Sequence, residues 1–249
     1  MDSEIIRANR EYLHSVADWI APEDYWNSRD HYGCPPRVLP FLNLPIDHEP
    51  TYTDLLVYAA ARLPAPVRYL ELGVSVGKNF YVLANALADA LLVGFDWERM
   101  NPRLAARFER TGTHDGVHWF RYRTNRIGYL QGDIGRFEDW TRLAGRRFNL
   151  IFSDACHQPE MLRRELAMLE RYELLDESAF VIVWDDLDRQ ADGPVTTAFD
   201  EIAARLAGRC PLARDGCFRI ELNGWLGQHE HRHTVGVINN IGLSPSSFQ

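Results

Sequence analysis

Residues 67–79 read VRYLELGVSVGKN, and this stretch decides the fold. Val67–Leu72 is an apolar run of strand length, Gly73–Gly77 is a turn of small residues, and a helical pattern begins at Lys78. A buried strand that passes through a glycine turn into a helix is typical of an open α/β sheet. The glycines let a ligand approach the backbone, and the start of the helix offers it N–H groups.

This turn differs from two other nucleotide-binding turns. The dinucleotide fingerprint has glycine at its first, third and sixth positions, and the glycines here do not follow that spacing. The phosphate loop requires Gly-Lys-Ser/Thr, whereas Asn79 follows Gly77 and Lys78. The sequence therefore predicts neither of these motifs.

Beyond the turn, short apolar runs alternate with helical patterns. This alternation predicts a mostly parallel sheet with helices on both faces. Two late runs predict a closing antiparallel hairpin, which makes seven strands, and residues 111–126 form an excursion before the third core strand. The expected strands are Val67–Leu72, Ala90–Phe95, Ile127–Leu130, Phe148–Phe152, Phe180–Trp184, Cys217–Leu222 and Thr234–Ile238, and the expected helices are Lys78–Ala88, Pro159–Tyr172 and Pro194–Leu206.

The N-terminal part has a different pattern. Residues 3–20 show helical spacing of apolar residues, and a second helix capped by Thr51 and Thr53 is expected to run to about Leu63. Between them, residues 22–50 are rich in proline and in aromatic side chains such as Tyr25, Trp26 and Tyr32. The sequence predicts an N-terminal helical cap over residues 1–64, whose loop closes over a substrate, and a Rossmann-like domain over 65–249.

Charge and hydropathy exclude several partners. The formal net charge is −8, which argues against a nucleic acid held by its phosphates. The sequence contains no apolar window of the roughly 20 residues that a membrane helix needs, and its first residues lack the apolar core of a signal peptide. We therefore expect a cytoplasmic protein with a small-molecule substrate, no nucleic acid and no membrane partner, and we leave a homo-oligomer open.

Each expected core strand beyond the first is followed by an acidic residue, and ligands of open α/β sheets bind at these carboxyl ends. A carboxylate at Asp96 could accept hydrogen bonds from both ribose hydroxyls of an adenosine, and Trp97 could lie against the adenine ring. A helix cap or solvated turn is the structural alternative for Asp96. The acidic residues are Asp96, Asp133, Asp154, Asp185 and Asp186.

These motifs resemble those of class I S-adenosylmethionine methyltransferases over about residues 65–240. The resemblance rests on ELGVSVG at 71–77, Asp96, GDI at 132–134 and FNLIFSD at 148–154. Ser75 stands where a third glycine is common in that family. The resemblance implies S-adenosylmethionine as cofactor, with the methionine part at Glu71, Gly73, Ser75 and Gly77, the ribose at Asp96, and the adenine at Trp97, Asp133 and Ile134.

A narrower resemblance is to metal-dependent O-methyltransferases, including some that act on sugars. That group carries an aspartate after the fourth strand and an acidic pair after the fifth, as Asp154 and Asp185-Asp186 do here. A histidine three residues after the first aspartate also matches, at His157, but Pro159 replaces a common tyrosine. The resemblance implies Mg²⁺ at Asp154, Asp185 and Asp186, and catalysis by His157 as base with Asp154 beside it. The structural alternatives are that Asp185 and Asp186 only cap the next segment and that His157 only caps or packs against a helix.

Three histidines near the C-terminus stay without an assigned role. His229, His231 and His233 would share one face of a strand. Such a face could bind a transition metal, but a polar face at a sheet edge is the stronger interpretation.

The sequence thus predicts a methyltransferase of a small molecule, with metal-assisted O-methylation of a hydroxyl as the leading hypothesis. A metal-independent N-methyltransferase is the alternative among enzymes. A non-catalytic Rossmann-like binding protein is the alternative outside them, because a fold does not by itself imply turnover.

Overall fold

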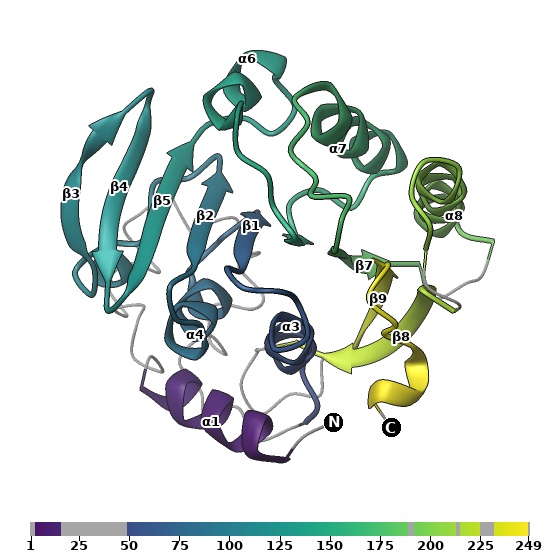
Figure 1. The fold of residues 1–249 in the computed structure, drawn as a ribbon, viewed down its shortest axis with the longest axis horizontal. Coiled ribbons are helices and arrows are strands. Elements are labelled where there is room, and N and C mark those ends of the chain that lie inside the picture. Colours follow the sequence, from purple (N-terminus) through teal and green to yellow (C-terminus); the bar gives the residue numbers. More distant parts are fainter. Residues whose placement is uncertain (1–2, 16–48, 189–191, 213–214, 225–231, 249) are drawn as a thin grey trace, which may run out of the picture.

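The computed structural model describes residues 3–15, 49–188, 192–212, 215–224 and 232–248 (Figure 1). Its centre is a nine-stranded sheet with the strand order β3-β4-β5-β2-β1-β6-β7-β9-β8. The strands are β1 (Arg68–Leu72), β2 (Leu91–Asp96), β3 (Glu109–His114), β4 (Val117–Tyr122), β5 (Asn125–Gln131), β6 (Leu150–Ser153), β7 (Val181–Leu187), β8 (Cys217–Asn223) and β9 (Arg232–Asn239).

The middle of the sheet is parallel, as the alternating pattern predicts. Strands β5, β2, β1, β6 and β7 pair in parallel in that order. The chain moves from β1 outward through β2 to β5 and then returns to β6 on the other side of β1. Such a reversal of strand order opens a crevice at the carboxyl ends of the strands, which is where an α/β sheet binds its ligand.

The expected number of seven strands was wrong. Residues 111–126 were expected as an excursion, but they lie mostly in the antiparallel hairpin β3–β4, which extends the sheet beyond β5. Almost every residue of β3 is exposed, so its sequence lacks the apolar alternation that marks a half-buried strand. The closing antiparallel hairpin was confirmed as β8–β9, and half of the eight strand pairings are antiparallel.

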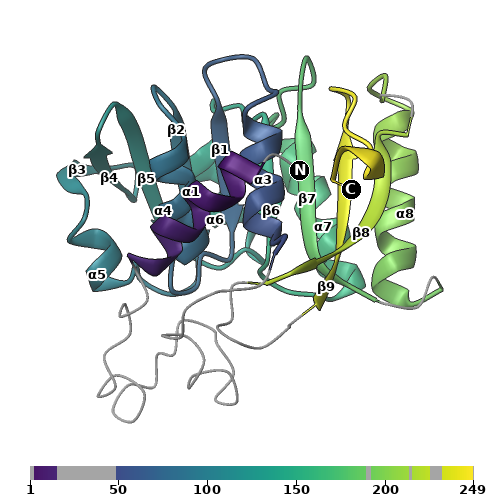
Figure 2. The same cartoon turned by 90° about the horizontal axis from the view of Figure 1, so that it is seen from below.

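Helices cover both faces of the sheet (Figures 1 and 2). One layer consists of α1 (Ser3–His14), α3 (Tyr52–Ala60) and α4 (Lys78–Ala86), and the other consists of α6 (Phe137–Trp140), α7 (Pro159–Arg171) and α8 (Pro194–Ala207). Two apolar clusters fill the spaces between the sheet and these layers. Three short elements complete the fold: α5 (Pro102–Ala105), η2 (Thr141–Leu143) and η3 (Pro245–Phe248). Among the described helices, none has the length and hydropathy that crossing a bilayer requires.

The two N-terminal helices are joined by one buried carboxylate. Thr51 and Asp54 form a capping box at the start of α3, as the sequence predicts for Thr51. Asp54 also accepts a hydrogen bond of 2.8 Å from Asn9 and pairs with Arg10 at 2.7 Å, so α1 is fixed against α3. The predicted lid, with Tyr25, Trp26 and Tyr32, lies in the range 16–48, outside the described residues, and stays a prediction.

Candidate functional site

The glycine turn after β1 is closely packed. Gly73 has φ +80°, and a β-carbon added there would lie 2.5 Å from the carbonyl oxygen of Asp154. Gly77 has φ +83° and precedes the first residue of α4. Ser75 adopts the left-handed region as well, with φ 53°, so the missing third glycine does not prevent the turn. Glycine at 73 thus lets the turn contact the end of β6, where Asp154 follows the strand.

Asp96 at the end of β2 supports this turn. Its Oδ2 accepts hydrogen bonds from the backbone N–H groups of Val74 at 2.6 Å and Ser75 at 2.8 Å, and its Oδ1 accepts one from Glu98 at 2.7 Å. Burial raises the pKa of Asp96, and these three hydrogen bonds act in the opposite direction. The carboxylate therefore holds the turn in place. Each carboxylate oxygen has two lone-pair directions, so these contacts leave acceptor capacity.

Glu71 lies in β1, two residues before Gly73, and is 1% exposed. Tyr69 donates a hydrogen bond of 2.8 Å to Glu71, and Asn79 donates one of 3.2 Å from the first turn of α4. Burial raises the pKa of Glu71 to about 8, although both hydrogen bonds lower it. A buried carboxyl group with a pKa near neutrality is often part of a functional site.

Three residues expected at the adenine lie after β2 and β5. Trp97 follows Asp96 and is 69% exposed, an unusual position for an indole ring. The backbone N–H of Asp133 donates to Asp139, and the Ile134 carbonyl accepts a hydrogen bond from buried Trp140. The loop after β5 is therefore fixed by its own contacts, and an aromatic surface stands beside it at the same sheet edge.

Asp154 and His157 approach each other after β6. His157 Nε2 lies 3.4 Å from Asp154 Oδ1 and 3.7 Å from Asp186 Oδ2, while its Nδ1 lies 3.3 Å from the Asp185 carbonyl oxygen. The Asp154 side chain is 27% exposed. Its pKa is raised well above its ordinary value, first by desolvation and then by the nearby charge of Asp185. The predicted pairing of His157 with Asp154 is present in the structure.

A β-bulge at the end of β7 positions the acidic pair. Along β7, Trp184 is paired with Gly236 and Leu187 with Thr234, so β7 carries one extra residue there. Asp186 has φ 50°, in the left-handed region that aspartate tolerates better than most residues. Neighbouring side chains of a regular strand point to opposite faces, and the bulge removes this alternation. Both carboxylates consequently face one histidine.

That histidine is His233, to which the sequence assigned no role. Its Nδ1 lies 2.8 Å from Asp185 Oδ2 and 2.7 Å from Asp186 Oδ1. Burial alone would lower the pKa of His233, but the two carboxylates raise it to about 10. The neighbouring His229 and His231 lie outside the described residues. The alternating histidines at 229, 231 and 233 were the signal for this residue, but only the register of β9 against β7 places it beside the acidic pair.

Tyr52 at the start of α3 is a second residue that the sequence reasoning missed. Its ring lies 5.5 Å from the His233 ring in an edge-on arrangement and 5.2 Å from Phe152. The parallel bridge between Thr51 and Asn223 brings the start of α3 to the end of β8. Burial raises the pKa of Tyr52, and the charges of Asp154 and Asp185 raise it further. The helix thus contributes an aromatic wall to the acidic site, which is the group formed by Asp154, His157, Asp185, Asp186 and His233.

The structure divides the expected metal ligands into two groups. Among the described residues, ligand atoms of Asp185, Asp186 and His233 all lie within 4.8 Å of one another. Asp154 is outside this set and is connected to it through His157. The donor set fits a divalent cation, because Asp185 is fully buried and neither of its carboxylate oxygens has a hydrogen-bond partner among the described residues.

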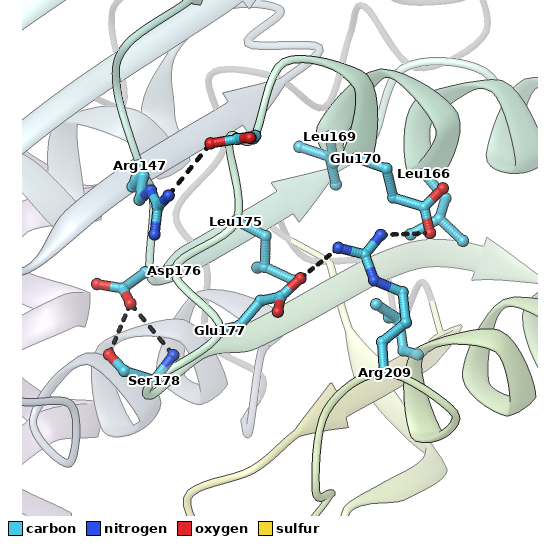
Figure 3. A pocket seen from close by; sticks show the side chains of 11 residues that line it. Arg147, Leu166, Leu169, Glu170, Leu175, Asp176, Glu177, Ser178 and Arg209 are labelled. Atoms are coloured by element: carbon cyan, nitrogen blue, oxygen red, sulfur yellow. Dashed lines mark hydrogen bonds and ion pairs between the residues drawn. The ribbon is translucent and has the colours of Figure 1, made fainter.

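The structure also contains a cavity with a charged rim, whose lining side chains are drawn in Figure 3. It has a volume of about 320 Å³ and is lined by residues that precede β6 and β7 or end α7 and α8. Its charged rim is internally paired, since Arg209 contacts both Glu170 and Glu177, and Arg147 contacts Glu173. The cavity is therefore remote from the acidic site, which lies at the carboxyl ends of the strands.

The sequence matches no protein-family model and no curated protein. Among solved structures, it is similar to the O-methyltransferase TomG of Streptomyces achromogenes, which is involved in tomaymycin synthesis and was solved with S-adenosylmethionine. The TM-score is 0.50 at 19% identity, over 92% of this chain and 89% of TomG. The plantazolicin methyltransferase BpumL gives 0.46 at 12% identity, over 95% of this chain and 98% of that one. A putative O-methyltransferase of Klebsiella pneumoniae gives 0.44 at 16% identity, over 92% and 99%. The likeness to TomG shows that the two chains share a fold, a Rossmann-like α/β sheet with helices on both faces.

Proposed function

We propose that this protein is an S-adenosylmethionine-dependent methyltransferase that methylates a hydroxyl group of a small molecule with the help of a divalent cation. One observation carries the proposal: the turn expected to hold the cofactor touches the acidic site. Gly73 packs directly on the Asp154 carbonyl oxygen, and Asp154 pairs with His157. A cofactor on the turn would have its methionine end beside a histidine and a set of carboxylates.

The turn and the neighbouring strand ends fit the cofactor. A side chain at Gly73 would clash with the backbone of Asp154, so glycine is what holds the turn against the end of β6. Glu71, Gly73, Ser75 and Gly77 would surround the methionine part. Asp96 would accept hydrogen bonds from the ribose, and the adenine would lie by Trp97, Asp133 and Ile134. S-adenosylmethionine supplies an activated methyl group, so the protein mainly has to align the acceptor.

The acidic site supplies what a hydroxyl acceptor needs. His157 would take the proton of the acceptor hydroxyl at Nε2, because its Nδ1 lies beside the Asp185 carbonyl oxygen, and Asp154, 3.4 Å from Nε2, would stabilise the ring once it is charged. Asp185 and Asp186 would hold the cation, for which the sequence predicts Mg²⁺. A bound divalent cation makes a coordinated hydroxyl more acidic. With both aids, the proton can be removed near neutral pH.

The direct test is methyl transfer to a panel of hydroxyl-bearing small molecules, such as catechols and glycosides, followed by mass spectrometry. We expect a product heavier by one methyl group with at least one acceptor. Activity should fall when EDTA is added and return with an excess of a divalent cation. Full activity in metal-stripped protein would contradict the role of the cation, and transfer to amines alone would favour the N-methyltransferase.

A further inference from the structure

Two carboxylates and one imidazole meet at the end of β7, and they come from strands that the sheet brings together. Asp185 and Asp186 lie in the β-bulge of β7, and His233 lies near the start of β9. All three ligand atoms lie within 4.8 Å of one another. Groups that bind one cation must be this close, because metal–ligand distances in proteins are about 2.0–2.6 Å.

An independent observation points to a ligand at this place. Asp185 has a fully buried side chain, and neither Oδ1 nor Oδ2 has a hydrogen-bond partner among the described residues. Oδ2 lies 2.8 Å from His233 Nδ1 and pairs with that ring when it is protonated, so Oδ1 is the oxygen that is left without a partner among the described residues. A buried carboxylate without hydrogen bonds is strongly disfavoured unless it is paired or coordinates a metal. An oxygen in this state is a suitable ligand for a cation.

We propose that Asp185, Asp186 and His233 form a site for a first-row transition metal, which binds there in preference to Mg²⁺. This inference rests on the proposed function, because it concerns the cation which that function uses. Oxygen ligands alone suit Mg²⁺, whereas an imidazole ligand favours transition metals such as Fe²⁺, Co²⁺, Ni²⁺ and Zn²⁺. With His233 as a ligand, the expected metal changes from Mg²⁺ to a transition metal. Asp154 is then not a ligand and pairs with His157.

The surroundings of His233 restrict its ring. A β-carbon added at Gly224 would lie 2.6 Å from His233 Nε2, and Tyr52 contacts the ring at 5.5 Å between centroids. Nδ1 is the nitrogen on the side of the two carboxylates. A ring held in this way loses little freedom when it binds a cation, which favours binding. The alternative is that His233 in its protonated form only neutralises the two carboxylates, and that the site takes up no cation.

Calorimetric titration of the full-length, metal-stripped protein with Co²⁺ and with Mg²⁺ tests the inference. We expect one Co²⁺ per chain and an affinity at least about 10-fold higher than that for Mg²⁺. His233→Gln should reduce Co²⁺ affinity by at least about 10-fold, since loss of even an outer-shell partner costs 10–100-fold. It should affect Mg²⁺ much less, and it should change the visible absorption of the Co²⁺ complex. His114→Gln, at an exposed histidine on the distant β3, is the matched control and should change nothing.

A second variant covers the case in which His233→Gln does not fold. Asp186 is 44% exposed, so Asp186→Asn keeps the shape of an accessible side chain and removes one charge. It should weaken binding of both cations by at least about 10-fold. Equal affinity for Co²⁺ and Mg²⁺, unchanged selectivity in His233→Gln, or no uptake of either cation would overturn the inference.

Binding of S-adenosylhomocysteine, measured in the same preparations, distinguishes this inference from the proposed function. If S-adenosylhomocysteine binds and Co²⁺ does not, the metal site is wrong and the cofactor site remains. If Co²⁺ binds with the expected selectivity and S-adenosylhomocysteine does not, the methyltransferase proposal fails and the metal site stands.

Discussion

The carboxylate of Asp96 accepts a hydrogen bond of 2.8 Å from the backbone N–H of Ser75. This contact connects the end of β2 to the glycine turn after β1, and it explains how a serine with φ 53° is kept in the turn. Asp96 is thus positioned both to shape the turn and to contact a ligand lying on it. Its role as a ribose acceptor remains part of the proposal.

Asp96→Ala should weaken binding of S-adenosylhomocysteine. Loss of hydrogen bonds to a charged acceptor costs about 1.5–3 kcal/mol, which corresponds to roughly 10–100-fold in Kd. Isothermal titration calorimetry on folded protein measures the change. Asp200→Ala, at an exposed aspartate on α8, serves as control and should leave Kd unchanged. An Asp96→Ala protein with wild-type affinity would show that this carboxylate does not contribute to the cofactor site.

Gly73→Ala should damage both stability and cofactor binding. The left-handed backbone at φ +80° costs a non-glycine residue about 1–2 kcal/mol, and the new β-carbon would meet the Asp154 carbonyl oxygen at 2.5 Å. Gly145→Ala is the matched control, since Gly145 has φ +76° and open space around its Cα. In urea denaturation both variants should lose stability, Gly73→Ala more. Affinity for S-adenosylhomocysteine should fall in Gly73→Ala alone, and equal effects of the two variants would contradict the close packing.

Buried Glu165 on α7 should make the protein less stable as the pH rises. Burial raises its pKa from 4.5 to about 7, although hydrogen bonds from Trp184 and Ser153 lower it. The folded state therefore binds more protons than the unfolded state between pH 4.5 and about 7, so the free energy of unfolding falls across this window. The full shift corresponds to about 3 kcal/mol.

Glu165→Gln removes this titration and retains an acceptor for the Trp184 indole. The variant should equal or exceed the wild type in stability above pH 7, and its advantage should vanish near pH 4.5. Chemical denaturation at several pH values measures the difference. Parallel pH profiles for the two proteins would show that Glu165 does not titrate in this range.

His157→Ala should slow methyl transfer by about 10²–10⁴-fold once an acceptor is known, which is the usual range for loss of a general base. Affinity for S-adenosylhomocysteine should stay close to that of the wild type, because the proposed cofactor contacts do not include His157. His118→Ala, in the hairpin β3–β4, controls for the loss of a histidine. Unimpaired turnover in His157→Ala would remove the base from the mechanism.

The sequence could predict the parallel core of the sheet and the aspartates at the carboxyl ends of its strands. Buried strands, glycine turns and strand ends each have a local sequence pattern. The sequence could not predict β3, whose exposed residues lack alternation. It also could not place His233 or Tyr52 at the site. His233 depends on the register of β9 against β7, and Tyr52 on a bridge from residue 51 to residue 223. Such long-range pairings leave no mark on the sequence near either partner.

The sequence also could not predict how the bulge in β7 arranges the expected metal ligands. A regular strand would point Asp185 and Asp186 to opposite faces, and the sequence shows no sign of the extra residue. The aspartate pair could be expected to follow the fifth core strand, but its shared contact with one imidazole could not be expected.

Titration of the wild-type protein with S-adenosylhomocysteine in a calorimeter tests the central claim, which is that the turn at 73–77 binds this cofactor. We predict saturable binding of one molecule per chain that NAD does not compete with, because the turn lacks the dinucleotide spacing of glycines. Folded protein that binds neither S-adenosylhomocysteine nor S-adenosylmethionine, or that binds NAD at the same site, would contradict it.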